Sequence, residues 1–267
     1  MENQETPEWQ APPPPEKIVP VNDPPQMSEL STILGIFIEP GKTFEDLKRK
    51  PRFIIGSIII CLLVTAYAFG LYYKVGEAAI RRVVVEQIDK SPQTASMPPE
   101  QKNGMIEMNL SIQRYIRYAI PVFVFISLLL GGLFYFLGSK AFGGNGRYLH
   151  GLSVWVYSSI PPTVVGMIAN FAVMAIKAAD EIDITASQRG VIQANPSLFV
   201  DGKAYPVLAT VIGTFDLFFI WGWVLAAIGL RITNKLSSGS AWGVVIIFAL
   251  IGTLMRVVGA YFSGNPN

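Results

Sequence analysis

The chain has 267 residues, of which 51% are hydrophobic and only 15% are charged, and its mean hydropathy is +0.41. Soluble domains carry about 25% charged residues, so this composition indicates a protein with much of its surface in lipid. The net charge of +2 is too small to suggest a nucleic-acid partner, and the single cysteine, Cys61, excludes an intrachain disulfide.

Residues 1–27 form a proline-rich segment that includes the run Pro12–Pro15 and is mainly acidic in its charge. Such a segment buries too little apolar surface to offset the entropy lost on ordering it. We expect a disordered cytoplasmic tail, partly in the polyproline II conformation. It would serve as a solvated spacer or as a ligand for a proline-recognising domain. Residues 28–267 form the predicted membrane domain.

Two short helices are predicted before the first long apolar stretch. An apolar stripe at helical spacing marks the first helix, which Pro40-Gly41 ends. The second would be capped by Thr43, with Asp46 at the capping-box spacing. An apolar stripe beside a basic cluster is typical of helices that lie on lipid headgroups. The alternative is that this region is a solvated collar around the start of the first span. The stripe is Leu30, Ile33, Leu34, Phe37 and Ile38, and the cluster is Lys42, Lys48, Arg49, Lys50 and Arg52.

Five long apolar stretches are predicted transmembrane helices. About 20 helical residues cross a hydrocarbon core of about 30 Å, and each stretch reaches that length. We therefore expect an all-α integral membrane protein with five transmembrane helices and its two ends on opposite sides of the bilayer. The stretches run approximately over residues 53–73, 118–137, 152–176, 206–230 and 241–262.

Basic residues in the short connections predict the orientation of the chain. Lys140 and Arg147 lie in loop 139–151, Arg231 and Lys235 lie in loop 231–240, and neither loop contains an acid. Together with the basic cluster before the first span, they predict a cytoplasmic N-terminus and an extracytoplasmic C-terminus. The expected location is the bacterial cytoplasmic membrane.

The long loop 74–115 is predicted to be helical outside the membrane. Apolar residues keep helical spacing at each of its ends, and the proline-containing stretch 91–99 separates the two parts. We expect two helical arms that pack against each other and the bilayer surface, or that bind a partner.

Two ionisable residues, Asp216 and Arg256, lie inside predicted spans. A lone charge in lipid costs about 2.5–3.5 kcal/mol on insertion scales, which favours pairing. The residues are therefore a candidate intramembrane ion pair. The alternatives are that Arg256 reaches the outer headgroups while Asp216 bonds to nearby hydroxyl groups, or that both belong to an ion or proton relay.

Pro161 and Pro162 fall inside the third predicted span. Two consecutive prolines remove two backbone donors and clash with the preceding carbonyl groups. We expect a helix kink or break at this point, which could also expose carbonyl groups to a substrate or ion.

The chain lacks the parts of a recognisable catalytic or metal site. His150 is its only histidine and has no second histidine, cysteine or paired carboxylate beside it in the sequence. The glycines of 143–146 lack the strand and the Gly-Lys-Ser/Thr ending of a phosphate-binding loop, and they are better read as a tight turn between helices. We expect neither enzymatic activity nor a cofactor.

Three short motifs follow one another in a familiar order. They are IFIEPGKTF (residues 36–44), GGNG (residues 143–146) and YSSIP (residues 157–161). Together they resemble the Yip family of Ypt/Rab-interacting membrane proteins, specifically its bacterial branch. The resemblance covers about residues 31–262 and implies a five-helix membrane domain with a cytoplasmic N-terminus. The family-like positions are Glu39, Pro40, Phe44, Gly143, Gly144, Tyr157 and Pro161.

The resemblance also bears on function, because the eukaryotic family binds prenylated Rab-type GTPases. The tail of this chain contains no Tyr-Asp-Pro-Pro-like segment. The predicted interfacial helix pair and the basic cluster beside it lead us to expect a membrane scaffold or adaptor with protein partners at its cytoplasmic face. A small transporter or channel using the third span and Asp216 is the alternative. Both functions are compatible with contact to the lipid bilayer and with a homo-oligomer.

Overall fold

The computed structural model describes residues 24–91, 94, 96–192, 194–202 and 204–263, and all of its regular elements are helices. The predicted all-α class is confirmed. The disordered tail predicted for residues 1–27 lies outside the described residues up to position 23. The α-helices are α1 (Glu29–Ile38), α2 (Pro40–Arg49), α3 (Ile54–Val75), α4 (Glu77–Lys90), α5 (Pro99–Ala141), α6 (Tyr148–Ile176), α7 (Pro206–Ile212), α8 (Leu217–Thr233) and α9 (Ser238–Ser263), and the short 3-10 helices are η1 (Ala179–Glu181), η2 (Ala186–Arg189) and η3 (Pro196–Phe199).

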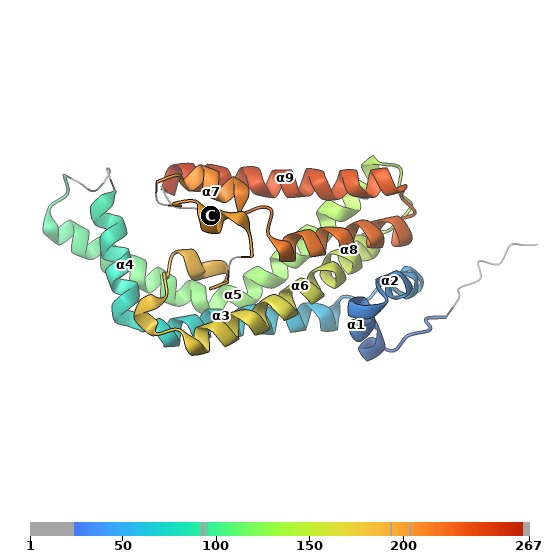
Figure 1. Ribbon diagram of the computed structural model, residues 1–267, viewed down its shortest axis with the longest axis horizontal. Coiled ribbons are helices and arrows are strands. Elements are labelled where there is room, and N and C mark those ends of the chain that lie inside the picture. The colour runs from blue at the N-terminus through green and yellow to red at the C-terminus, as the bar shows by residue number, and fades with distance from the viewer. Residues whose placement is uncertain (1–23, 92–93, 95, 193, 203, 264–267) are drawn as a thin grey trace, which may run out of the picture.

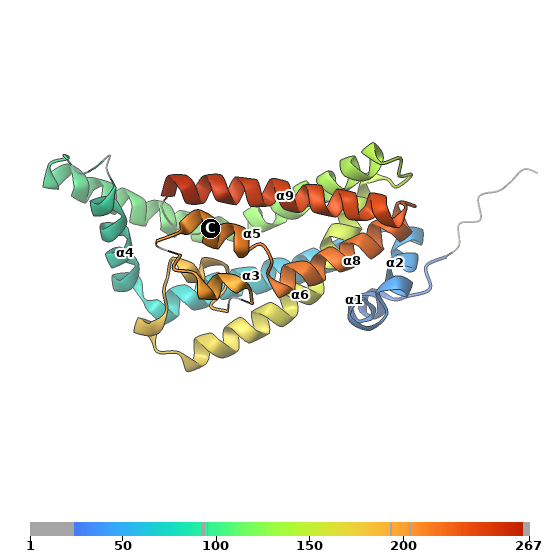
Figure 2. The same ribbon diagram turned by 45° about the horizontal axis from the view of Figure 1, so that its top comes forward.

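The long helices run alongside one another and form a bundle (Figures 1 and 2). Four of them, α3, α5, α6 and α9, are each long and apolar enough to cross a membrane. Helices α7 and α8 provide a fifth crossing if they are counted as one span, bent by 44° at the break between them. The predicted multi-pass membrane architecture is therefore confirmed.

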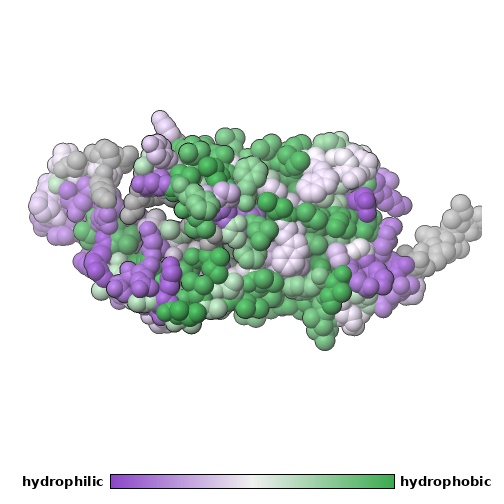
Figure 3. All heavy atoms as spheres, in the orientation of Figure 1, coloured by the Kyte–Doolittle hydropathy of each residue, from purple (hydrophilic) through white to green (hydrophobic). Residues whose placement is uncertain are grey.

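The outer surface of the bundle is apolar over most of its length. Figure 3 shows a broad hydrophobic band along the middle of the molecule and hydrophilic residues gathered at its two ends. Large apolar side chains point outward from the helices, including Leu62 and Leu254, which are 65% and 64% exposed. Such a band is the surface expected of a protein whose solvent is hydrocarbon.

Helix α6 lies at the centre of the bundle and packs against α3, α5 and α8. Its Leu152, Val156, Tyr157 and Ile160 are almost completely buried. Gly132 of α5 faces Leu152 so closely that a Cβ atom there would lie 2.7 Å from the Leu152 Cα. A small residue at such a position lets two membrane helices approach each other at the backbone.

Helices α1 and α2 lie at one end of the bundle, where α2 packs against α8 and α1 packs against α2 and α6 (Figure 1). The second helix begins at Pro40 and not at Thr43, so the predicted Thr43 cap is wrong. Proline suits a first helical position because the missing N–H would have no partner there. Thr43 is consequently buried inside α2, while Leu34 and Ile38 on α1 point away from the bundle and are 56% and 81% exposed.

The predicted helical arms form the opposite end of the molecule. Helix α4 and the first turns of the long α5 extend from the bundle as an antiparallel pair (Figures 1 and 2). Val84 and Ile88 of α4 are buried with Ile106 of α5, so the arms pack against each other. An ion pair between Arg81 and Glu107 also joins them.

Of the kink or break predicted at Pro161 and Pro162, the break is wrong, because α6 continues through both prolines. The kink stays a prediction. The neighbours of α6 hold the helix on several sides, and packing of this kind lets membrane helices tolerate proline. The described part of the chain has its break in the fourth span instead, between α7 and α8. Asp216 accepts a hydrogen bond there from the Phe218 N–H and starts a new helix.

Candidate functional site

A cavity of about 470 Å³ lies between α6, α8, α9 and the α6–α7 connection, which comprises residues 177–205. A volume of 300–1,000 Å³ is typical of small-molecule sites. Aromatic side chains line much of it, among them Trp155, Phe219 and Trp223. Its polar lining residues include Ser158, Ser159, Asn170, Asn195, Asp216 and Arg256.

The α6–α7 connection folds back against the bundle and forms one wall of this cavity. The Ile192 N–H donates to the side-chain oxygen of Asn170 in α6 at 2.9 Å. The Tyr67 hydroxyl of α3 donates to the Ser187 carbonyl at 2.7 Å. Irregular backbone is tolerated at membrane depth where it is buried in protein or lines a cavity, and both conditions are met here.

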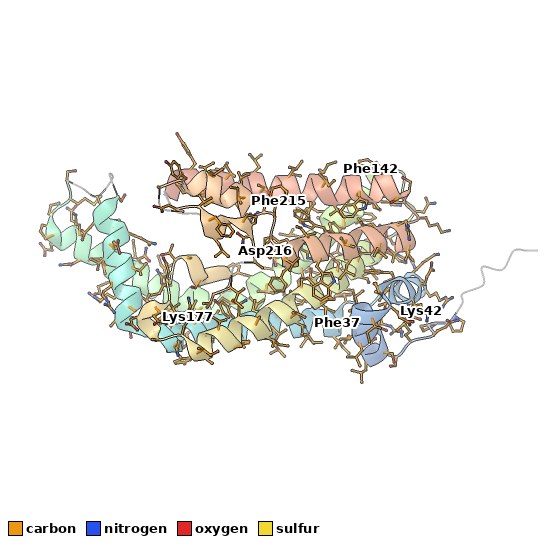
Figure 4. The ribbon with its side chains drawn as sticks, in the orientation of Figure 1. Phe37, Lys42, Phe142, Lys177, Phe215 and Asp216 are labelled. Atoms are coloured by element: carbon orange, nitrogen blue, oxygen red, sulfur yellow. The ribbon has the colours of Figure 1, made fainter. Side chains whose placement is uncertain are left out.

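Asp216 fastens the same connection to the start of α8. Its carboxylate accepts hydrogen bonds from the Ala194 N–H at 3.1 Å, the Asn195 side-chain amide at 3.0 Å and the Phe218 N–H at 2.9 Å. Figure 4 labels the residue at the break between α7 and α8. The side chain is 8% exposed, whereas its neighbour Phe215 points outward and is 59% exposed.

Arg256 lines the cavity from α9 but does not form the predicted ion pair with Asp216. Its guanidinium donates to the Thr214 hydroxyl at 2.5 Å and lies 5.7 Å from the centre of the Phe219 ring. The hydrogen bonds of Asp216 go to Ala194, Asn195 and Phe218 instead. Asp216 does not need Arg256 as a partner, because backbone and amide N–H groups already surround its carboxylate.

A second polar cluster lies at the other end of the bundle, beside α1 and α2. The buried Arg52 guanidinium lies 3.3 Å from the Asp46 carboxylate, and it donates to the Thr32 hydroxyl and the Met27 carbonyl at 2.7 Å each. Asp46 accepts in turn from the Gln26 and Met27 N–H groups. This cluster, named here the Arg52–Asp46 clamp, fixes the chain where it enters the membrane domain.

His150 belongs to the same end of the bundle and has a structural role. Its Nδ1 accepts from the Arg147 N–H at 3.2 Å, so its Nε2 carries the proton and donates to the Lys48 carbonyl, also at 3.2 Å. The ring thereby caps α6 and ties it to the last turn of α2. Within the described residues, no group of three or more His, Cys, Asp or Glu side chains could hold a metal ion.

Comparison with known proteins identifies the family of this fold. The Yip1 domain matches residues 34–259. The chain belongs to the Yip1 domain family. It is similar to the membrane protein YknW of Bacillus subtilis (strain 168), with 27% identity over 243 residues that make up 86% of this chain and 94% of YknW. No solved structure matches it. The predicted resemblance to the bacterial branch of the family is confirmed.

The family-like positions of this Yip1 domain gather at the α1–α2 end. Pro40 begins α2, while exposed Glu39 precedes it and pairs with Lys42. Phe44 is fully buried against Gly229 of α8, and Tyr157 lies in the core of α6 beside Pro161. The buried Phe44 and Tyr157 hold α2 and α6 in the bundle.

The glycines of the second family-like motif form the turn between α5 and α6, as the sequence predicts. Gly143 adopts a φ of +81°, which side-chain-bearing residues rarely adopt. A Cβ on Gly144 would lie 2.8 Å from the Ser139 carbonyl oxygen. The turn packs against the α8–α9 connection, where the Asn145 N–H donates to the Asn234 carbonyl. Two connections of the Yip1 domain are thus joined at the α1–α2 end.

Sequence reasoning missed three residues that build the cavity. Asn170 and Asn195 hold the α6–α7 connection, and Trp155 lines the wall opposite. An aspartate before an apolar run is a helix-start signal, and Asp216 could have been read in that way. The partners that Asn170 and Asn195 find across the fold carry no such local signal.

Proposed function

We propose that this chain is a non-enzymatic membrane adaptor of the Yip type, located in a bacterial cytoplasmic membrane. Its N-terminal segment and the α1–α2 surface recruit protein partners on the cytoplasmic side. The Arg52–Asp46 clamp is the observation that carries the proposal, because it holds residues 26 and 27 rigidly against the membrane domain. Residues 26 and 27 are thereby held at a fixed point beside the α1–α2 pair, where partners can reach both.

The charges at this end of the bundle support the cytoplasmic orientation. The α5–α6 and α8–α9 connections meet there, and they bring Arg147 and Lys235 to the same side as Lys42 and Arg49 of α2. Basic residues in short connections favour the cytoplasmic face of a membrane.

Site-specific photo-crosslinking in cells tests the adaptor role. A photoreactive residue at exposed Lys42 should give an adduct with one defined protein, whereas one at lipid-facing Leu250 should give none. Asp46→Ala, which releases residues 26 and 27, should abolish the adduct while the protein still reaches the membrane. If exposed positions along α1 and α2 yield only lipid adducts, the adaptor role is wrong.

The cavity favours a second candidate function, that of a small transporter. A cavity with Asp216 and Arg256 in its wall resembles the binding region of a carrier, and the α7–α8 break supplies the interrupted span that such sites use. Flux of small ions and zwitterions into liposomes tests it. Asp216→Asn keeps a helix-capping oxygen but removes the charge, so it should abolish flux without loss of folding. No flux with the unmodified protein would exclude this candidate.

A further inference from the structure

Two opposite charges line the cavity without pairing with each other. Among its described lining residues, Asp216 is the only acid and Arg256 the only base. The Asp216 carboxylate is held by N–H groups of the α6–α7 connection and α8, whereas Arg256 contacts Thr214 on its own side of the cavity. The wall is therefore neutral in formal charge but has separate negative and positive sites.

Both charges lie at a similar depth in the bundle. Asp216 precedes the 17 residues of α8, which puts it about 25 Å from the α1–α2 end at 1.5 Å per residue. Arg256 follows the start of α9 by 18 positions, or about 27 Å. A hydrocarbon core is about 30 Å thick, and both α7 and α9 continue beyond these charges, so both side chains lie within the membrane-spanning part of the bundle.

Both groups have the chemistry to contact a ligand. A carboxylate offers about four acceptor sites, and Asp216 uses three of them for hydrogen bonds within the chain. A guanidinium suits phosphate because its planar fork of N–H donors matches two phosphate oxygens. Trp223 and Phe219 lie in the same wall and favour the apolar or cationic part of a ligand.

We infer that the cavity binds a zwitterionic phosphoammonium group, with its phosphate at Arg256 and its ammonium at Asp216. This inference goes beyond the adaptor role and does not depend on it. The same chemistry occurs in the headgroup of an ethanolamine phospholipid from the surrounding leaflet and in a water-soluble phosphoethanolamine. An anionic headgroup without an ammonium could bind Arg256 but would offer no positive group to the Asp216 carboxylate, which would then repel it.

Calorimetric titration of the purified full-length protein in maltoside detergent tests this inference with three probes. They are dihexanoyl phosphatidylethanolamine, phosphoethanolamine and dihexanoyl phosphatidylglycerol. At least one of the two zwitterions should bind at least tenfold more tightly than the phosphatidylglycerol probe. Binding of only the phosphatidylethanolamine probe identifies membrane lipid as the source, and comparable binding of phosphoethanolamine identifies a soluble ligand.

Variants assign the two charges to the two parts of the ligand. Asp216→Asn should weaken zwitterion binding about tenfold, because the ammonium contact is lost, and should not weaken binding of the phosphatidylglycerol probe. Arg256→Gln should weaken the binding of all three probes. If this variant fails to fold, Arg256→Lys replaces it. Arg81→Gln on the distant α4 is the matched control and should change none of the affinities.

Three outcomes would overturn the inference. They are equal or tighter binding of the phosphatidylglycerol probe, unchanged zwitterion affinity in folded Asp216→Asn, and absence of binding by every probe. The first and third need no variant at all, so a folding defect in a mutant does not remove the test.

Discussion

Two buried carboxylates organise separate parts of this molecule in the same way. Asp46 accepts hydrogen bonds from the backbone N–H groups of residues 26 and 27, and Asp216 accepts them from the N–H groups of Ala194 and Phe218. In both cases a charged acceptor satisfies backbone donors of an irregular segment that packs against helices. Hydrogen bonds to a charged group are about twice as strong as neutral ones, so a single side chain can hold such a segment.

Removal of the Asp46 carboxylate should destabilise the protein strongly. Asp46→Ala leaves the buried Arg52 without its buried partner and leaves two backbone N–H groups without their acceptor. Breaking a buried ion pair costs about 3–5 kcal/mol, so we expect a loss of about 3 kcal/mol in the free energy of unfolding. Unfolding in sodium dodecyl sulfate, followed by circular dichroism, measures it.

The matched control for this prediction is Lys42→Ala. Lys42 pairs with Glu39, but both side chains are largely exposed, at 74% and 54%. Exposed pairs contribute little, so the free energy of unfolding should change by no more than about 0.5 kcal/mol. Equal effects of the two substitutions would contradict the role assigned to the clamp.

At the scale of elements, close contact between α5 and α6 holds the centre of the bundle. Gly132 faces the backbone of Leu152, and Gly151 faces Phe136 in the reverse direction, with a Cβ on Gly151 at 2.8 Å from the Phe136 nitrogen. Contact at this distance maximises dispersion between helices, which matters in lipid because the hydrophobic effect does not drive helices together there. Helix α6 in turn carries the residues that shape the cavity.

A methyl group at Gly132 should therefore separate the two helices. Gly132→Ala places a Cβ at 2.7 Å from a backbone carbon, and overpacking of this kind costs about 1–3 kcal/mol. Gly252 of α9 offers the comparison, since a Cβ there meets nothing within 4 Å. Gly252→Ala should be neutral or stabilising by up to about 1 kcal/mol. Thermal unfolding in detergent distinguishes the two, and a stabilising Gly132→Ala would refute the close-contact argument.

At the scale of the whole molecule, the two ends of the bundle differ in kind. One end carries α1, α2 and the joined α5–α6 and α8–α9 connections, and the other carries the α4–α5 arms (Figure 1). The apolar band between them aligns both ends with opposite membrane faces (Figure 3). The orientation proposed above follows from the basic residues of the first end.

Cysteine labelling of spheroplasts should report this orientation. In a Cys61→Ser background, Asn103→Cys on the arm should react with a membrane-impermeant maleimide in intact spheroplasts. Ser238→Cys at the start of α9 should react only after lysis. Both native residues are exposed, so the contrast reports sidedness and not burial. The reverse pattern would place the α1–α2 end outside and would contradict the adaptor proposal.

Much of this architecture could be predicted from the sequence by itself. Helix length, apolar content and the proline and glycine signals specified the spans, the helical arms of loop 74–115 and the turn at Gly143, because each depends on the chemistry of neighbouring residues. The same local logic failed at Pro161 and Pro162. A proline signals a helix break only where surrounding packing does not hold the helix, and α3, α5 and α8 surround α6.

The tertiary structure alone decided the partners of the buried polar residues. Asp216 and Arg256 lie on neighbouring spans, which made an ion pair the economical arrangement in a lipid environment. The folded connection instead supplies Ala194 and Asn195 to Asp216, and thereby creates the cavity wall. Length and hydropathy determine which segments enter the membrane, because insertion depends on each segment's own transfer energy. Polar contacts inside it depend on which segments meet, and only the packed fold determines that.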